Sequence, residues 1–235
     1  GEKAFNNIGE KKCLSHLLNS PGNFTASKLA WVKANEPGIY ERIDKMMLPG
    51  DFIAMKFTGE ATTTSSALSE GIFWDFKKGT ISEDVMNYFG FENSLIPKVQ
   101  ALFSSHGKIS SDVAKQLGIN ENCQVTYKAG DQPNNALSLN VLQPGEVAAN
   151  GGTSGVIYAV TDKLLSDKFS RVNSFVHVNH ATDKKRIGVL LCINGAAIMY
   201  SGAKNVCGEN LRYKEMEQQA AKIKPGSDGL FVLPF

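Results

Sequence analysis

The chain has 235 residues, of which 42% are hydrophobic and 20% are charged. This composition supports the packed core of one large domain or two small ones, and it excludes a wholly disordered chain. The 25 basic residues nearly balance the 23 acidic ones, and the net charge is only +2. Charge therefore gives no reason to expect nucleic acid or an anionic membrane as a partner. The sequence shows neither an apolar run of about 20 residues nor a signal-peptide pattern, so we expect a cytoplasmic protein.

The four cysteines follow neither a disulfide pattern nor a zinc-binding pattern. Cys13, Cys123, Cys192 and Cys207 lie far apart, and none belongs to a C-x-x-C pair. Four cysteines are too few to hold a fold of this length together by disulfides. We therefore expect four reduced thiols and no bound metal at these residues.

The first half of the chain has the spacing of helices separated by short turns. Residues 48–51 predict a turn, with Asp51 as the N-cap of a helix over 52–57. Residues 60–71 are rich in Thr and Ser and predict a polar loop or an irregular helix. Two further short helices are predicted by a serine at the start and a glycine at the end, over 82–90 and 111–118.

The pattern changes near residue 122. Residues 123–128 alternate as in a strand, and they lead through Gly130-Asp131-Gln132 into a helix that begins at Pro133. The Gln143-Pro144-Gly145 break is a candidate domain boundary. Beyond it, strands are predicted at 147–149, 156–160, 175–178 and 187–193, helices at 195–206 and 209–223, and a last buried strand at 229–235. The strand at 187–193 is continuously apolar, which is typical of a strand buried on both faces.

Asp131 is the residue whose position in the sequence most clearly suggests a chemical role. An acid that follows a strand and precedes a helix lies where open α/β sheets bind ligands. A carboxylate there can accept the proton of a substrate hydroxyl, as the base of a phosphoryl-transfer enzyme does. The alternative is a turn aspartate that caps the following helix.

A second candidate is the Gly151-Gly152-Thr153-Ser154-Gly155 segment between two predicted strands. Glycines let backbone N–H groups approach an anion, and the two hydroxyls add donors for phosphate oxygens. The segment is neither a Walker A motif nor G-x-G-x-x-G. A tight hairpin without a ligand explains it equally well.

Other polar residues give weaker signals. His177 and His180 are three residues apart, and in a strand or loop we expect them to face solvent. Trp74 lies between apolar residues and is predicted to belong to the core.

A series of short segments, taken in order, resembles the central part of FGGY-type carbohydrate kinases. They are NFTASKLAWV (23–32), EP (36–37), MLPGDFI (47–53), FTGE (57–60), AGDQ (129–132), GGTSG (151–155) and GSDGLFVLPF (226–235). The resemblance implies an α/β, actin-like (ribonuclease H-like) fold with parts of two domains, and a cleft for a sugar, ATP and Mg²⁺.

The resemblance also implies roles for individual residues. Asp131 corresponds to the family's general base, and Gln132 and Asn23 to positions that contact the sugar. Gly152, Thr153 and Ser154 correspond to the loop that binds the phosphates of ATP. No residue is implied as a metal ligand. The expected partners are the sugar and ATP, without nucleic acid or membrane, and a homodimer is left open.

The family's first Asp-x-Gly-Thr motif and its late glycine-rich adenine motif have no counterpart in this chain. We therefore expect a central fragment, with residues 1–143 from the sugar-binding first domain and 144–235 from the nucleotide-binding second domain. Such a fragment is expected to be inactive alone. The favoured substrate is D-xylulose. The alternatives are ribulose, fuculose, gluconate or glycerol, or an actin-like protein that binds sugar or nucleotide without catalysis.

Overall fold

The computed structural model describes residues 1–207 and 210–232 of the chain. Contacts divide these residues into two compact units. The first contains Gly1–Ala148 and Tyr158–Leu190, and the second contains Ala149–Ile157 and resumes at Leu191. Each unit is described by itself below.

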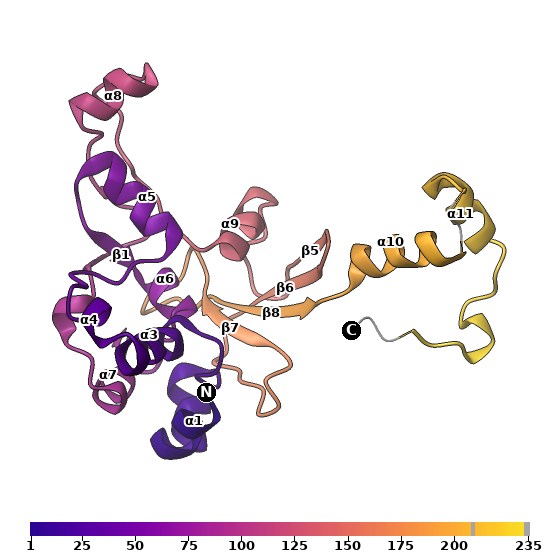
Figure 1. Ribbon diagram of the computed structural model, residues 1–235, viewed down its shortest axis with the longest axis horizontal. Coiled ribbons are helices and arrows are strands. Elements are labelled where there is room, and N and C mark those ends of the chain that lie inside the picture. The colour runs from indigo at the N-terminus through magenta and orange to yellow at the C-terminus, as the bar shows by residue number, and fades with distance from the viewer. Residues whose placement is uncertain (208–209, 233–235) are drawn as a thin grey trace. The chain divides into compact units, whose positions relative to one another are not determined.

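A group of helices at the start of the first unit encloses its largest hydrophobic core (Figure 1). Helix α3 contacts α4 and α7, and α1 contacts α2 and α7. Phe73 and Val85 are fully buried in this core. The helices are α1 (Glu2–Ile8), α2 (Glu10–Lys12), the π-helix η1 (Cys13–Leu17), α3 (Thr25–Asn35), α4 (Pro37–Tyr40), α7 (Glu83–Phe89) and the short 3₁₀-helix η2 (Asn93–Leu95).

The two helices predicted from a serine and a glycine are both present. In α7 the Ser82 hydroxyl accepts a hydrogen bond from the Val85 N–H, and Gly90 ends the helix in the left-handed conformation. Helix α8 (Ser111–Leu117) ends in the same way at Gly118, with Ser110 rather than Ser111 as its N-cap. These caps satisfy the backbone groups left free at each helix end.

The segment from residue 49 to 71 differs from its prediction. Helix α5 (Pro49–Thr58) starts at the proline, so Asp51 is a buried residue of its first turn and not its N-cap. The Thr- and Ser-rich stretch forms strand β1 (Thr62–Thr64) and helix α6 (Ser65–Glu70) instead of a loop. Strand β1 pairs in parallel with β4 (Lys98–Gln100), which lies some 35 residues further along the chain, and local patterns do not reveal this pairing. A small hairpin follows α6, formed by β2 (Trp74–Asp75) and β3 (Thr80–Ile81).

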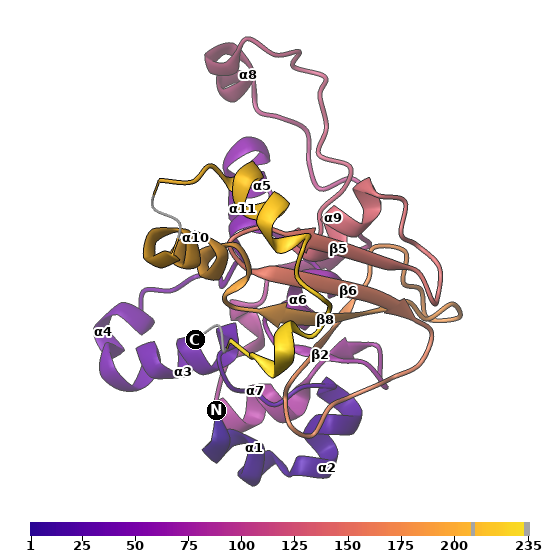
Figure 2. The same cartoon turned by 90° about the vertical axis from the view of Figure 1, so that its right-hand side faces the viewer.

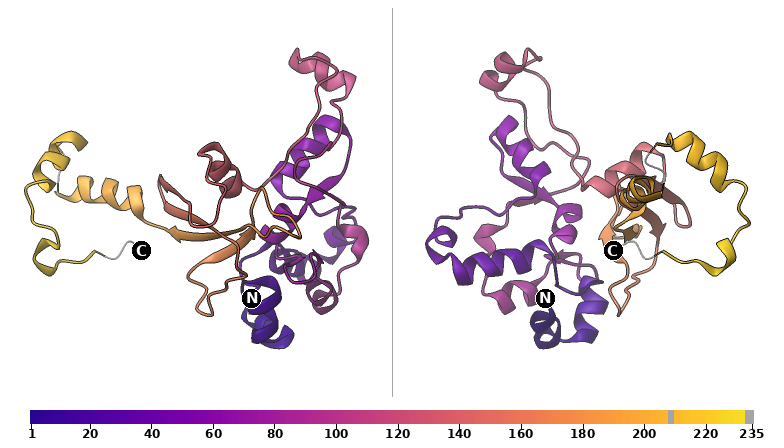
Figure 3. Two further views of the ribbon diagram at one scale, coloured as in Figure 1. Left: turned by 180° about the vertical axis from the view of Figure 1, so that it is seen from behind. Right: turned by 45° about the vertical axis from the view of Figure 1, so that its right-hand side comes forward.

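Residues 123–128 do not form the predicted strand. They form the second arm of a long projecting segment that carries α8, which Figure 3 shows from two sides. Two isolated bridges join its two arms, Phe103 to Tyr127 and Lys108 to Gln124, and the N–H of His106 donates to the carbonyl of Val125 between them. The stacked rings of Phe103 and Tyr127, 4.7 Å apart, lie at its base. Residues 123–128 therefore pair with residues 102–109 at separate points and form no continuous ladder.

Helix α9 (Asp131–Ser138) leads to a four-stranded sheet of order β5-β6-β8-β7. The strands are β5 (Val147–Gly151), β6 (Gly155–Thr161), β7 (Asn173–Val176) and β8 (Ile187–Ile193), and β6 and β8 lie side by side in Figure 2. All four predicted strands are therefore present. Strand β8 is buried at its start but exposed at Cys192 and Ile193, so the prediction of burial on both faces was wrong.

His177 follows β7 and is fully buried, contrary to the expectation that it faces solvent. Its Nδ1 lies 3.0 Å from the Tyr158 hydroxyl and its Nε2 lies 3.1 Å from the Val141 carbonyl. Burial lowers the pKa of His177 to about 4. Across the sheet, a Cβ at Gly188 would overlap the Tyr158 ring, so this position needs glycine. His180 is half-buried.

The second unit contains the ends of β5, β6 and β8, helices α10 (Ala196–Cys207) and α11 (Tyr213–Ala220), and the 3₁₀-helix η3 (Ser227–Gly229). Both predicted helices are present, though α11 is shorter than expected. Leu230 and Phe231 are 74% and 87% exposed and form no strand. The predicted buried strand is therefore wrong for its described part, and its residues 233–235 lie outside the described residues.

Cys13, Cys123 and Cys192 are free thiols, and the side chain of Cys207 lies outside the description. No helix in the described part of the chain has the length and apolar character needed to cross a membrane. The domain boundary at residue 143 stays a prediction. Trp74 packs against the main core, as expected.

Candidate functional site

A buried ion pair anchors the segment that leads to Asp131. The Lys128 ammonium lies 2.8 Å from an Asp51 carboxylate oxygen, and the two side chains are only 6% and 4% exposed. The same ammonium donates to the carbonyl and the hydroxyl of Thr62, at 2.6 and 2.9 Å. The ion pair and the two hydrogen bonds of Lys128 thus attach the residues before Asp131 to α5 and β1.

The hydrogen bonds continue from Thr62 to His106. The Thr62 hydroxyl lies 3.2 Å from His106 Nδ1, and His106 Nε2 lies 3.2 Å from the Leu102 carbonyl. Because a carbonyl only accepts, Nε2 carries the proton and Nδ1 accepts from the hydroxyl. Burial is the main cause that lowers the pKa of His106, which keeps the ring neutral in this chain of bonds.

Asp131 is the first residue of α9 and follows Gly130, the N-cap. Its carboxylate is exposed and accepts a hydrogen bond of 2.7 Å from the backbone N–H of Gln132. An acidic residue in the first turn of a helix is favoured, because the free N–H groups of that turn point toward it. Asp131 is therefore an accessible, anchored carboxylate, and Gln132 beside it is half-buried.

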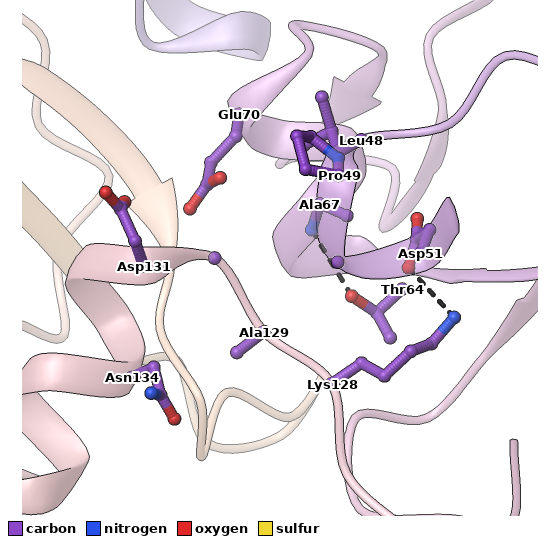
Figure 4. A pocket seen from close by; sticks show the side chains of 12 residues that line it. Leu48, Pro49, Asp51, Thr64, Ala67, Glu70, Lys128, Ala129, Asp131 and Asn134 are labelled. Atoms are coloured by element: carbon purple, nitrogen blue, oxygen red, sulfur yellow. Dashed lines mark hydrogen bonds and ion pairs between the residues drawn. The ribbon is translucent and has the colours of Figure 1, made fainter. Parts of the chain in front are cut away.

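A cavity of about 470 Å³ opens next to Asp131 (Figure 4). It is formed by the start of α5, the end of β1, helix α6 and the turn into α9. Its lining residues are Leu48, Pro49, Gly50, Asp51, Thr64, Ala67, Glu70, Lys128, Ala129, Gly130, Asp131 and Asn134. A cavity of this size with several carboxyl groups and one amide suits a small, hydroxyl-rich molecule.

Glu70 is a site residue that the sequence did not reveal. It ends α6, and Figure 4 shows its side chain directed from α6 toward the turn before Asp131. Burial first, and then the charges of Asp131 and Asp51, raise the pKa of Glu70 to about 8. Nothing in the local sequence distinguishes a glutamate at the end of a Thr/Ser-rich segment as a residue that lines the cavity. Only the fold brings it to residue 130.

The structure places the other predicted site residues elsewhere. Asn23 is an exposed turn residue with a positive φ just before α3, and it does not line this cavity. Gly152, Thr153 and Ser154 form the turn between β5 and β6 in the second unit. There the N–H groups of Ala197 and Ile198 donate to the carbonyls of Gly152 and Thr153, at 3.2 and 3.4 Å.

The described residues have an α/β, actin-like (ribonuclease H-like) fold. The xylulose kinase from Lactobacillus acidophilus matches 99% of this chain and 47% of its own, with a TM-score of 0.88 and 18% identity. The gluconate kinase from the same organism also covers 99% of this chain and 47% of its own length, with a TM-score of 0.88 and 18% identity. At such identities these likenesses establish the fold alone.

The sequence match identifies the family. Residues 10–138, more than half of the chain, match the N-terminal domain of the FGGY family of carbohydrate kinases. The chain therefore belongs to the FGGY family of carbohydrate kinases. The xylulose kinase of Lactococcus lactis subsp. lactis (strain IL1403) is 25% identical over 212 residues, which is 90% of this chain and 41% of that relative. The chain spans less than half the length of this relative and of the two solved structures.

Proposed function

We propose that this chain carries the sugar-binding and proton-accepting part of an ATP-dependent carbohydrate kinase, and that its substrate is D-xylulose. The observation that supports this most strongly is the accessible carboxylate of Asp131 beside the 470 Å³ cavity, within the segment that matches the FGGY family. D-Xylulose is preferred because the similar relative from Lactococcus lactis is a xylulose kinase. Gluconate, glycerol, ribulose and fuculose are the alternatives, since the fold alone also matches a gluconate kinase.

In the proposed reaction, a sugar hydroxyl lies against Asp131. Its oxygen attacks the γ-phosphorus of ATP and forms the new O–P bond, while the bond between the γ-phosphorus and the β–γ bridging oxygen breaks and ADP leaves. The proton of the hydroxyl passes to the Asp131 carboxylate. The ion pair between Lys128 and Asp51 holds the turn so that the carboxylate keeps its position.

Gln132 and Asn23 are proposed as sugar contacts, and Gly152, Thr153 and Ser154 as donors to the phosphates of ATP. We further propose that residues 1–143 end the sugar-binding domain and that 144–235 begin the nucleotide-binding domain. The described residues contain no group of three or more His, Cys, Asp or Glu side chains that could hold a metal ion. We propose that Mg²⁺ accompanies ATP, since a divalent cation neutralises the charge of the phosphates during phosphoryl transfer.

The test is ADP release by the full-length protein with D-xylulose, ATP and magnesium, compared with its Asp131→Asn variant. The variant keeps the side-chain size but removes the base, so turnover should fall about 10³-fold or more while sugar binding persists. Near-normal turnover in the variant would refute the role of Asp131. Activity on another sugar only would correct the substrate, and sugar binding without phosphorylation of any sugar would favour a non-catalytic protein.

A further inference from the structure

The carboxyl group of Glu70 lies directly against the backbone of Gly130, the residue before Asp131. A Cβ added to Gly130 would overlap the Glu70 carboxyl oxygens. The φ of Gly130 is −66°, which any residue adopts. The absence of a side chain at Gly130 therefore leaves room that the Glu70 carboxyl fills, and a larger residue here would have to displace that carboxyl.

The groups that face Glu70 leave its charge without compensation. Asp131 of α9 and Asp51 of α5 act on it as like charges, and Tyr158 of β6 lies within reach of its charge. Lys128 lines the same cavity, but its ammonium is bound to Asp51 and Thr62. Within the described ranges 1–207 and 210–232, the Glu70 carboxyl has no hydrogen-bond or ion-pair partner in the protein.

A largely buried carboxyl group without a cation retains its proton, and the pKa of Glu70 is accordingly raised to about 8. At neutral pH it is then a hydrogen-bond donor, whereas Asp131 is anchored by an N–H and faces the cavity as an acceptor. Glu70 thus adds a donor oxygen to the lining of the cavity and Asp131 adds an acceptor oxygen.

We propose that Glu70 is a second sugar-binding residue, which donates a hydrogen bond to the hydroxyl next to the one that Asp131 deprotonates. This inference rests on the proposed function and deepens it. The substrates it selects are polyols with two neighbouring hydroxyls, one to donate its proton to Asp131 and one to accept from Glu70. Above pH 8 the carboxyl loses its proton, so sugar binding weakens as the pH rises.

The experiment measures the KM and kcat for sugar, and the sugar Kd by calorimetry, from pH 6 to 10 in the full-length protein. Glu70→Gln keeps an N–H donor without charge, Glu70→Ala removes the donor, and Gly130→Ala displaces the carboxyl while keeping the glutamate. Glu60→Gln is the control, because Glu60 is an exposed carboxylate on the same segment.

For the unchanged protein we expect the KM and Kd for sugar to rise about tenfold between pH 7 and 9. Glu70→Gln should abolish this rise, and Glu70→Ala and Gly130→Ala should raise the KM about tenfold at pH 7 with a smaller effect on kcat. Glu60→Gln should follow the unchanged protein. A flat KM profile in the unchanged protein, a Glu70→Gln profile that equals it, or an unaltered KM in Glu70→Ala would overturn the proposal.

The same experiment separates this proposal from the one on which it rests. If the protein phosphorylates sugar and loses this activity in Asp131→Asn, but the Glu70 variants keep the original profile, only the role of Glu70 fails. If no sugar is bound or phosphorylated by the unchanged protein, both proposals fail.

Discussion

Two glycine-containing turns of this chain look equally suited to bind a substrate, but different interactions hold them in place. The turn at Gly130 and Asp131 is fixed by buried side chains, above all the pair of Lys128 and Asp51. The turn at Gly152 and Thr153 is exposed, and main-chain hydrogen bonds from the start of α10 hold it. The first turn thus depends on buried side chains of its unit, and the second depends on main-chain hydrogen bonds from α10. Substitutions near the first should change stability as well as function, whereas those in the second should change ligand binding alone.

The largest effect should come from the core behind the first turn. Phe73 is fully buried against the end of α6, where a Cβ on Gly71 would touch its ring. Phe73→Ala should lower the free energy of unfolding by about 4 kcal/mol, because it removes buried area and leaves a cavity. Phe231→Ala, at an 87% exposed residue of the second unit, should change it by less than about 0.5 kcal/mol. Urea unfolding followed by fluorescence of Trp31 and Trp74 measures both. Equal losses of stability in the two variants would contradict the difference between the buried core and the exposed residue.

The buried ion pair comes next. Lys128→Met leaves the Asp51 carboxylate buried without a cation and should destabilise by about 3 kcal/mol. Adding Asp51→Leu removes the stranded charge and should recover most of this loss, since a well-packed apolar pair often replaces a buried ion pair without penalty. Urea unfolding of the single and double variants measures the loss and the recovery of stability. A double variant no more stable than Lys128→Met would show that the pair does more than neutralise charge.

The dependence of stability on pH tests the buried histidine. The pKa of His177 is lowered to about 4 from an ordinary value near 6.5, so the unfolded state takes up the proton first as the pH falls. The stability that neutral His177 contributes is full above pH 6.5 and is lost between pH 6.5 and 4, by about 2 kcal/mol from pH 7 to 5. His177→Gln should reduce this loss in urea titrations at the two pH values. An unchanged loss would assign the effect to other groups.

The smallest effect is expected at the second turn. Thr153→Ala should raise the KM for ATP about tenfold, the loss of roughly one hydrogen bond to a charged group, without a measurable change in stability. Steady-state kinetics of the full-length protein together with urea unfolding measure the two effects. Thr161→Ala, at the far end of β6, is a matched control. A destabilised Thr153→Ala variant would show that the second turn also depends on packing.

The sequence by itself determined the features that have a local cause. Ser82 and Gly90 bound a helix because a hydroxyl caps its free N–H groups and a glycine accepts the left-handed conformation. The strands β5 to β8 follow from apolar runs between turns, and the order of short segments indicated the family. Asp131 was a candidate because an acid before a helix has a recognisable local setting, and its role stays a proposal.

Only the tertiary structure decided which polar residues are brought together. Asp51 was expected to cap a helix and instead pairs with Lys128, far along the chain. Residues 123–128 alternate like a strand but make only separate bridges and hydrogen bonds with residues 102–109, without a continuous ladder. His177 is buried against Tyr158, and Glu70 lies against Gly130. In each case the deciding contact joins residues that are distant in the sequence, and burial and pairing, which set the charge and conformation of a polar group, exist only once those segments pack.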